Sequence, residues 1–263
     1  MNRIDKKFKE LRREKKKAFI AYITAGDPDL ATTERMVVAL EDSGVDMIEL
    51  GVPFSDPLAD GPTIQAASYR ALKKKVTLKK IFGMVERLRK KTEVPLVFMT
   101  YYNPVLKYGV DRFFLSCRAS GVDGVIIPDL PYEEAKETAR SGMSNYVATI
   151  FLVAPTSTPE RIAKIAGLSR GFIYYVSLTG VTGARASLPA EIASNVRRIK
   201  SVTDKPVAVG FGISNPEQAR NVAKTADGVI VGSALVKIIG ERKNGISHVR
   251  KFTQNLAKAI HNV

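Results

Sequence analysis

Short apolar runs alternate along the chain with longer stretches whose apolar residues recur every three or four positions. A continuous apolar run is typical of a strand buried on both faces, and the three-to-four spacing is typical of an amphipathic helix. The strands expected on this basis are 18–23, 47–50, 95–100, 124–127, 147–153, 172–176, 206–209 and 228–231. The helices expected between and after them are 30–43, 63–72, 77–91, 110–120, 131–141, 159–166, 189–202, 215–224, 233–239 and 247–260.

This order of elements predicts a closed parallel barrel. Strands that alternate with helices form βαβ units, and parallel sheets carry buried, apolar strands. Eight such units in 263 residues match the size of a (β/α)₈ TIM barrel, which needs about 250 residues. Ile4, Phe8 and Leu11 predict an extra N-terminal helix over 4–14. No linker-like tract interrupts the pattern, so we expect one catalytic domain over 1–263.

Composition narrows the class of protein. Hydrophobic residues make up 45% of the chain, as in ordinary globular domains. The one cysteine, Cys117, leaves no disulfide framework, so a reducing compartment such as the cytoplasm is expected. No apolar run approaches the roughly 20 residues of a membrane span, and no apolar signal core follows the basic N-terminus. We therefore expect neither a membrane protein nor a secreted one.

The chain is strongly basic, with a formal net charge of +15 and a pI of 9.8. Lysines cluster at 15–17 and 73–75. Basic residues near a helix end complement the helix dipole, and no aromatic residues or nucleic-acid motif accompany these clusters. The charge therefore predicts a solvated basic surface, with nucleic-acid binding as the weakest alternative.

The stretch 48–61, Ile-Glu-Leu-Gly-Val-Pro-Phe-Ser-Asp-Pro-Leu-Ala-Asp-Gly, turns abruptly from a strand into a loop. Glu49 stands among apolar neighbours at the strand end, where a charge is costly unless it is used. Asp56 and Asp60 follow in the loop. Asp56 could equally be a turn or helix cap, whereas that alternative is disfavoured for Glu49, because a cap belongs on a loop and not inside an apolar strand end. The stretch predicts an acidic site at one strand exit.

Glycine-bearing turns follow the last three expected strands, at 179–184, 210–214 and 231–234. Glycine allows backbone N–H groups to approach an anion, and a helix that begins at Ser233 would direct its positive end there. Phosphate sites after strands seven and eight are common in barrels. The turns therefore predict a phosphate site, while a dinucleotide site is disfavoured because no such glycines follow the first strand.

Several kinds of chemistry are not expected. Both histidines, His248 and His261, fall in the last helix, away from the strand exits. This argues against a zinc site and against histidine acid–base catalysis. No expected strand contains a lysine for a Schiff base, and Cys117 has no histidine to activate it. Carboxylates remain: Glu49 in an apolar setting that raises its pKa, and Asp60 in a polar loop that keeps it ionised.

The run from Ile48 to Gln65, the glycine turns and the segment from Asn215 to Gln218 together resemble the tryptophan synthase alpha subunit family, over essentially the whole chain. The resemblance implies a retro-aldol cleavage of indole-3-glycerol phosphate to indole and glyceraldehyde 3-phosphate, as one step of tryptophan biosynthesis. It also implies that this chain needs neither a metal nor an organic cofactor, because pyridoxal phosphate belongs to the partner beta subunit. The implied assembly is an α₂β₂ tetramer in which indole passes through a tunnel, with the loop near Pro53 and Asp56 at the contact.

The resemblance also implies roles for residues. Glu49 would be the general acid–base group, and Asp60 would hold the indole N–H and stabilise positive charge on the ring. Thr182 would meet the aspartate loop on closure. The positions that match the family's phosphate site are Gly183, Gly212, Gly232 and Ser233, and those that match its indole pocket are Tyr22, Tyr101, Tyr174 and Phe211.

Three other readings stay open at this level. The chain could be a lyase that acts alone, with high activity in the absence of a partner. It could be a barrel kept mainly to activate the beta subunit, without a reaction of its own. It could also bind nucleic acid, which steeply salt-dependent retention on DNA would reveal.

Overall fold

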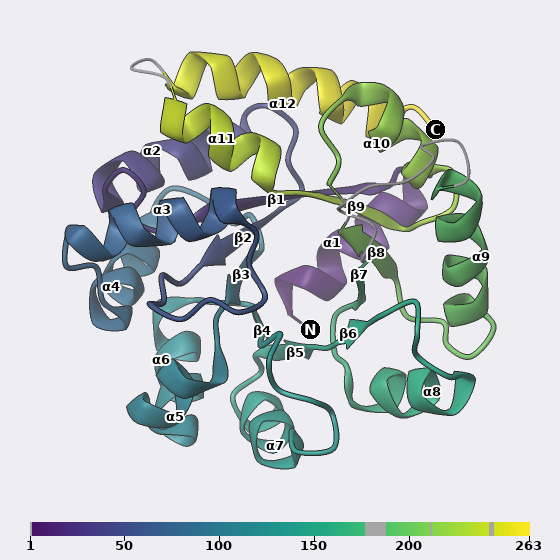
Figure 1. The fold of residues 1–263 in the computed structure, drawn as a ribbon, viewed down its shortest axis with the longest axis horizontal. Helices are drawn as coiled ribbons and strands as arrows, with labels where there is room; N and C mark the ends of the chain where they lie inside the picture. Colours follow the sequence, from purple (N-terminus) through teal and green to yellow (C-terminus); the bar gives the residue numbers. More distant parts are fainter. Residues whose placement is uncertain (1, 177–187, 211, 242–244) are drawn as a thin grey trace.

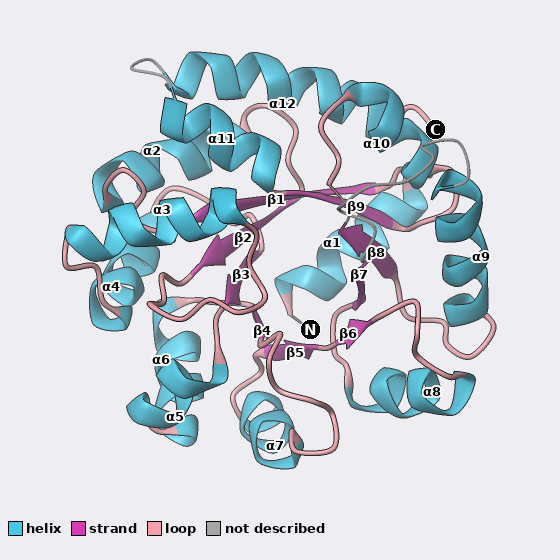
Figure 2. Cartoon of the chain, viewed as in Figure 1, coloured by secondary structure: helices cyan, strands magenta, loops and turns pink. Residues whose placement is uncertain are grey.

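The computed structural model describes residues 2–176, 188–210, 212–241 and 245–263. Within them, parallel strands form a ring that is surrounded by helices, as Figures 1 and 2 show. The strands are β1 (Ala18–Thr24), β2 (Met47–Gly51), β3 (Leu96–Met99), β4 (Gly124–Ile126), β5 (Ala148–Ile150), β6 (Leu152–Val153), β7 (Ile173–Val176), β8 (Val207–Gly210) and β9 (Gly228–Val231). This arrangement confirms the predicted TIM barrel.

The sheet order is β5-β4-β3-β2-β1-β9-β8-β7-β6, and every neighbouring pair is parallel. The two ends of this order, β5 and β6, are consecutive in the chain and separated by Phe151 alone. One predicted strand, 147–153, is thus divided in two: its first half pairs with β4 and its second half with β7. The division lets this segment close the ring.

Most helices lie where the periodicity places them. They are α1 (Arg3–Arg13), α2 (Leu30–Glu41), α3 (Pro62–Lys73), α4 (Leu78–Leu88), α5 (Tyr102–Tyr108), α6 (Val110–Ser120), α7 (Lys136–Ser144), α8 (Pro159–Leu168), α9 (Leu188–Lys200), α10 (Pro216–Ala223), α11 (Ser233–Glu241) and α12 (Gly245–His261). Helix α5 was not predicted, because Pro104 obscures its short pattern, although proline is compatible with a first helical turn. Helix α7 begins at Lys136 rather than at 131.

Alternate residues of each strand face the inside of the ring or the helices. In β1, Ile20 belongs to a buried cluster inside the barrel, whereas Phe19 and Ile23 belong to the layer between strands and helices. The predicted extra helix, α1, lies across the amino-terminal end of the ring (Figure 1) and adds Ile4, Phe8 and Leu11 to the inner cluster. The barrel interior is therefore closed at this end by apolar side chains.

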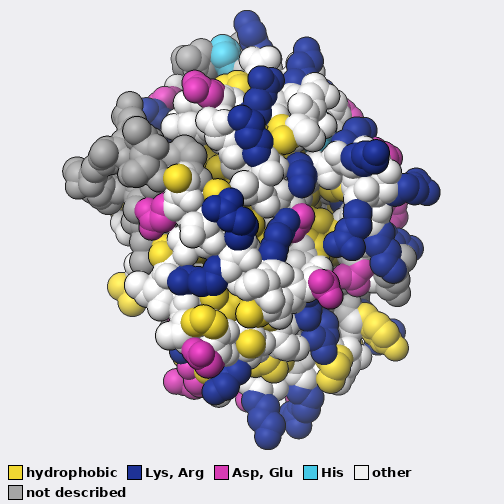
Figure 3. Space-filling model, turned by 90° about the vertical axis from the view of Figure 1, so that its right-hand side faces the viewer, with side chains coloured by type: hydrophobic (Ala, Val, Ile, Leu, Met, Phe, Trp, Pro, Cys, Tyr) yellow, Lys and Arg dark blue, Asp and Glu magenta, His cyan; other side chains and the backbone are white. Residues whose placement is uncertain are grey.

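Basic side chains occupy the last turns of several helices. Figure 3 shows Lys and Arg side chains across a whole side of the molecule, among fewer acids. Last helical turns carry Arg87 in α4, Arg118 in α6 and Lys200 in α9, whereas first turns carry Glu160 in α8 and Glu217 in α10. Each sign complements the helix dipole. Because barrel helices run antiparallel to the strands, the cationic ends gather at the amino-terminal face.

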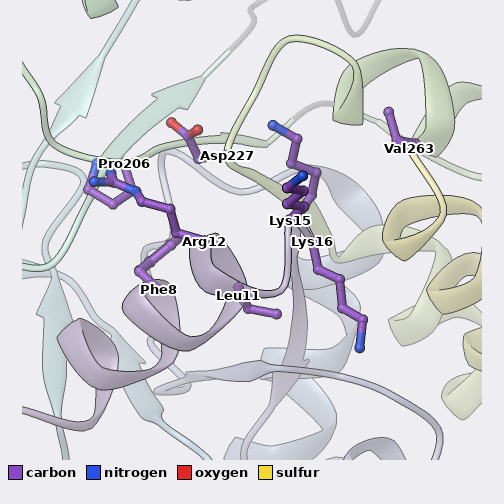
Figure 4. A pocket seen from close by; sticks show the side chains of 9 residues that line it. Phe8, Leu11, Arg12, Lys15, Lys16, Pro206, Asp227 and Val263 are labelled. Atoms are coloured by element: carbon purple, nitrogen blue, oxygen red, sulfur yellow. The ribbon is translucent and has the colours of Figure 1, made fainter.

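That face also contains a pocket of about 270 Å³, shown in Figure 4. Arg12, Lys15 and Lys16 reach it from the end of α1 and the following turn, while Asp227 lies beside it just before β9. The charges are partly paired, since Lys16 binds Glu14 and Asp227 binds Lys200. The pocket is at the barrel end opposite the strand exits, so it is separate from the predicted acidic site.

Candidate active site

The predicted site residues fall on adjoining strands at the open end of the barrel. In order around the sheet they come from β7 (Tyr174), β8 (followed by Gly212), β9 (followed by Gly232 and Ser233), β1 (Tyr22) and β2 (Glu49). Tyr22 and Glu49 are direct partners in the register of β1 with β2. These strand ends therefore open at the same mouth of the barrel.

Glu49 is the most constrained acid of the site. Its side chain is completely buried, and neither carboxylate oxygen has a hydrogen-bond partner among the described residues. Burial raises the pKa of Glu49 to about 8, because the charged form loses hydration and gains no compensating contact. A carboxyl group with this pKa is largely protonated near neutral pH and can both donate and accept a proton there.

Two tyrosines flank this carboxyl group inside the barrel. Tyr22 and Tyr174 are 5% and 8% exposed. Burial is the main cause that raises the pKa of each phenol, and the charges of Glu49 and Asp60 add to it in both cases. Both phenols thus lie within electrostatic reach of both acids, which places the four side chains in one neighbourhood.

Glycines make room for these tyrosine rings. A methyl group on Gly210 of β8 would lie 2.4 Å from the hydroxyl oxygen of Tyr174, and one on Gly232 would lie 3.3 Å from the Cβ atom of Tyr22. The tyrosine rings therefore fit at the strand ends because the neighbouring positions are glycines, which have no side chain.

Asp60 reaches the site from the loop that follows β2. Partial burial raises the pKa of its carboxyl group to about 6, and the nearby Tyr101 hydroxyl has a smaller, opposite effect. The setting is thus less polar than the sequence suggests. The pKa of Asp60 nevertheless stays below that of Glu49.

Tyr101 also holds the backbone of this loop. The N–H of Ala59 donates to the Tyr101 hydroxyl at 2.9 Å, and the rings of Phe54 and Tyr101 pack with centroids 5.3 Å apart. Asp56, in contrast, is exposed and accepts a hydrogen bond from Ser55 at 2.6 Å. Asp56 therefore lies outside the pair of acids and behaves as a loop residue.

One predicted phosphate position, Gly232, lies next to Tyr22. Gly232 follows β9 and Ser233 begins α11, whose first backbone N–H groups have no acceptor within the helix. Gly212 is exposed, with open space where a side chain would stand. An anion here would meet N–H donors and the positive end of α11. The remaining predicted residues, Thr182, Gly183 and Phe211, lie outside the described residues.

A metal site or a histidine near the strand exits would indicate a different chemistry. The described parts of the chain contain no group of three or more His, Cys, Asp or Glu side chains that could hold a metal ion. His261 contacts Asp46 at 2.9 Å, at the amino-terminal end of the barrel. None of the described helices is long and apolar enough to cross a membrane.

Two residues to which the sequence assigned no role also shape the site. Gly51 of β2 leaves space for the Tyr22 ring, and Asp129, after β4, accepts the backbone N–H of Tyr102 at 2.9 Å. The glycine had a signal, because it interrupts an apolar strand two residues after Glu49 on the same face. The contact of Asp129 had no signal in the sequence, because it is made with the first residue of helix α5, which was not predicted.

Comparisons with known proteins agree with this geometry. A family model described as "Tryptophan synthase alpha chain" matches residues 8–262. The chain is 55% identical to the tryptophan synthase alpha chain of Geotalea daltonii, over 99% of this chain and 94% of that one. It is 51% identical to that of Geobacter sulfurreducens, over 100% of both. Among solved structures it is similar to tryptophan synthase subunit alpha from Legionella pneumophila, with a TM-score of 0.94 and 39% identity over 100% of both chains. It is also similar to a chain of Mycobacterium tuberculosis tryptophan synthase, with a TM-score of 0.91 and 42% identity over 99% of this chain and 98% of that one.

Proposed function

The chain belongs to the tryptophan synthase alpha chain family, and we propose that Glu49 and Asp60 carry out its reaction. It is a lyase of tryptophan biosynthesis that cleaves indole-3-glycerol phosphate to indole and glyceraldehyde 3-phosphate. The observation that carries the proposal is the fully buried Glu49 carboxyl group, whose oxygens have no partner among the described residues. A group held in this way is available to a substrate.

The proposed proton transfers begin from protonated Glu49 and ionised Asp60. Glu49 donates its proton to C3 of the indole ring, which gives the ring a positive charge. Asp60 accepts a hydrogen bond from the indole N–H and stabilises that charge. The Glu49 carboxylate then removes the proton of the glycerol hydroxyl adjacent to the ring. The bond from C3 to the glycerol carbon breaks, its electron pair returns to the ring, and indole and the aldehyde form. The pKa values of about 8 and 6 support this assignment, because both required states coexist near neutral pH.

The rest of the mouth would position the substrate. We assign the phosphate to the backbone N–H groups near Gly212, Gly232 and Ser233, together with Gly183. The indole ring would lie against Tyr22, Tyr101, Tyr174 and Phe211, and Thr182 would close on the aspartate loop. Fixing both ends of the substrate would place C3 beside Glu49. In well-oriented reactions, such positioning removes up to about 7–11 kcal/mol of the activation barrier.

The family implies a beta subunit as partner. We propose an α₂β₂ assembly in which the loop with Pro53 and Asp56 lies at the contact. Next to this loop is a groove lined partly by apolar side chains, among them Phe54, Leu78 and Pro104. The alpha chain would need no cofactor of its own, since pyridoxal phosphate would be held by the beta subunit. We also propose that the whole chain acts as one domain in the cytoplasm, where its buried thiol, Cys117, would remain reduced.

Release of indole from indole-3-glycerol phosphate tests the proposal, with and without a purified beta subunit. We expect Glu49→Gln to abolish release, because the amide keeps the shape of the side chain but cannot transfer the proton. Asp60→Asn should reduce the rate at least about 100-fold, as loss of one electrostatic partner commonly does. Full activity of Glu49→Gln would refute the assignment. High activity without the beta subunit would instead favour a lyase that acts alone.

A further inference from the structure

We infer that Tyr101 and Asp129 are positioning residues that hold the loop of Asp60 in place, through a chain of contacts across the start of α5. The inference rests on the proposed role of Asp60 and adds a second function for Tyr101. Its ring would face the substrate, while its hydroxyl group would serve the aspartate loop.

The first step is the position of the Tyr101 hydroxyl. It accepts the N–H of Ala59 at 2.9 Å, so it holds the backbone directly before Asp60. It also lies close enough to the Asp60 carboxylate for each group to shift the pKa of the other. Its effect lowers the pKa of Asp60 and so opposes the effect of burial.

The second step is the packing that fixes the Tyr101 ring. Its side chain is only 5% exposed and lies against Phe54, with ring centroids 5.3 Å apart at an interplanar angle of 31°. Phe54 belongs to the same loop as Asp60. The ring therefore contacts the beginning of the loop while the hydroxyl contacts its end, which limits the positions that the loop can take.

The third step is the attachment of Tyr101 to β4. Tyr101 is the residue before α5, and its own side chain does not cap that helix. The carboxylate of Asp129, from the loop after β4, accepts the N–H of Tyr102 through both oxygens, at 2.9 and 3.2 Å. An acceptor at this position stabilises the helix start, whose N–H groups lack partners within the helix. Asp129 thereby fixes the backbone from which Tyr101 extends.

The experiment measures the pKa of Asp60 without relying on turnover. The full chain is labelled with ¹³C at the aspartate carboxyl carbons, and the Asp60 signal is identified by its loss in Asp60→Asn. Tyr101→Phe removes the hydroxyl but keeps the ring on Phe54. We expect it to raise the pKa of Asp60 by about half a unit or more, and Asp129→Ala to raise it in the same direction by less. Tyr108→Phe is the matched control, since Tyr108 ends the same helix and its hydroxyl contacts Ser116 instead.

The same variants are then assayed for indole release across pH. Tyr101→Phe should move the acid limb of kcat/KM upward and lower kcat more than it raises KM, because the substrate still meets the ring. An unchanged carboxyl titration in Tyr101→Phe would overturn the inference. A shifted titration in a chain that releases no indole would instead uphold the contact and refute the proposed function, so the two failures are distinguishable.

Discussion

The hydroxyl group of Tyr22 lies directly over the α-carbon of Gly51. A methyl group on Gly51 would come within 2.0 Å of the phenol oxygen and 2.5 Å of the ring carbon that bears it. Gly51 is two residues beyond Glu49 in β2, so both positions face the inside of the barrel. The glycine thus allows an aromatic wall next to the acid.

This relationship predicts that Gly51→Ala impairs both folding and activity. The contact is too short to be relieved without moving the buried Tyr22 ring, and overpacking of this kind costs about 1–3 kcal/mol. We expect a lower Tm and a loss of indole release of at least about tenfold. Gly167→Ala is the matched control, because no atom lies within 4 Å of the added methyl group.

A second change should restore part of the loss. Tyr22→Leu in the Gly51→Ala background removes the ring that the methyl group meets, so Tm should recover while activity stays low. If Gly51→Ala alone were as stable and active as the parent chain, the Tyr22 ring would not be held as described.

The two carboxyl groups predict a bell-shaped dependence of kcat/KM on pH. Asp60 must be ionised, which requires a pH above about 6, and Glu49 must be protonated, which requires a pH below about 8. Activity should therefore be highest between these values. The substrate phosphate also titrates near pH 6. Asp60→Asn distinguishes the two groups, because the part of the acid limb due to Asp60 should vanish. Activity that keeps rising through pH 9 would contradict the role of protonated Glu49.

Glu49 is also expected to reduce stability at high pH. Its pKa is raised in the folded chain, so the folded state favours the protonated form. The corresponding stability is fully present below the unfolded pKa, near 4.5, and is lost as pH rises through about 8. Glu49→Gln should therefore raise the free energy of unfolding little at pH 5 and by roughly 2–4 kcal/mol at pH 9.

Urea unfolding at both pH values measures this difference. Glu133→Gln is a suitable control, because Glu133 is exposed and pairs with Arg161 on the surface. A Glu49→Gln variant that is no more stable than the parent at pH 9 would show that the carboxylate is compensated in solution.

Gly212 offers a test of the phosphate site that leaves the fold unchanged. Since nothing lies within 4 Å of an added methyl group, Gly212→Ala should keep the parent Tm. The methyl group would nevertheless stand where the phosphate has to approach the backbone. We expect KM for indole-3-glycerol phosphate to rise about tenfold or more, with a smaller change in kcat. An unchanged KM would place the phosphate elsewhere.

The sequence predicts this barrel well because its strands are apolar on both faces and their helices repeat with regular spacing. It also locates Glu49, since a charge inside a strand end stands out against its neighbours. It could not foresee that the loop of Asp60 packs under Tyr101, because that contact joins residues 42 positions apart through a helix that the pattern did not reveal. The partial burial of Asp60, and with it the pKa of about 6, follows from that packing.

A second feature was present in the sequence but was not used. Asp46, Asp123 and Asp227 each directly precede a strand, namely β2, β4 and β9. Each carboxylate accepts the N–H of a residue in the adjoining strand: Phe19 at 2.8 Å, Leu96 at 2.9 Å and Val207 at 2.9 Å, respectively. In each segment an aliphatic or small residue precedes the aspartate, and the strand begins directly after it, as in Val45-Asp46 and Ala226-Asp227. The repeat is a device for joining neighbouring strands at the closed end of the barrel.

Asp123 is the member of this set whose loss should cost most stability. It is buried, with its Oδ2 atom 2.7 Å from Arg89 and its Oδ1 atom 3.1 Å from Arg3. Asp123→Ala would leave the Leu96 N–H and the largely buried Arg89 without this acceptor, which typically costs about 3–5 kcal/mol. Asp227→Ala is the comparison, because Asp227 makes the same backbone contact but its side chain is 28% exposed, so that water can replace it. Urea unfolding should show the larger loss for Asp123→Ala. Equal losses would mean that the backbone contact, rather than the buried ion pair, sets the stability of this end of the barrel.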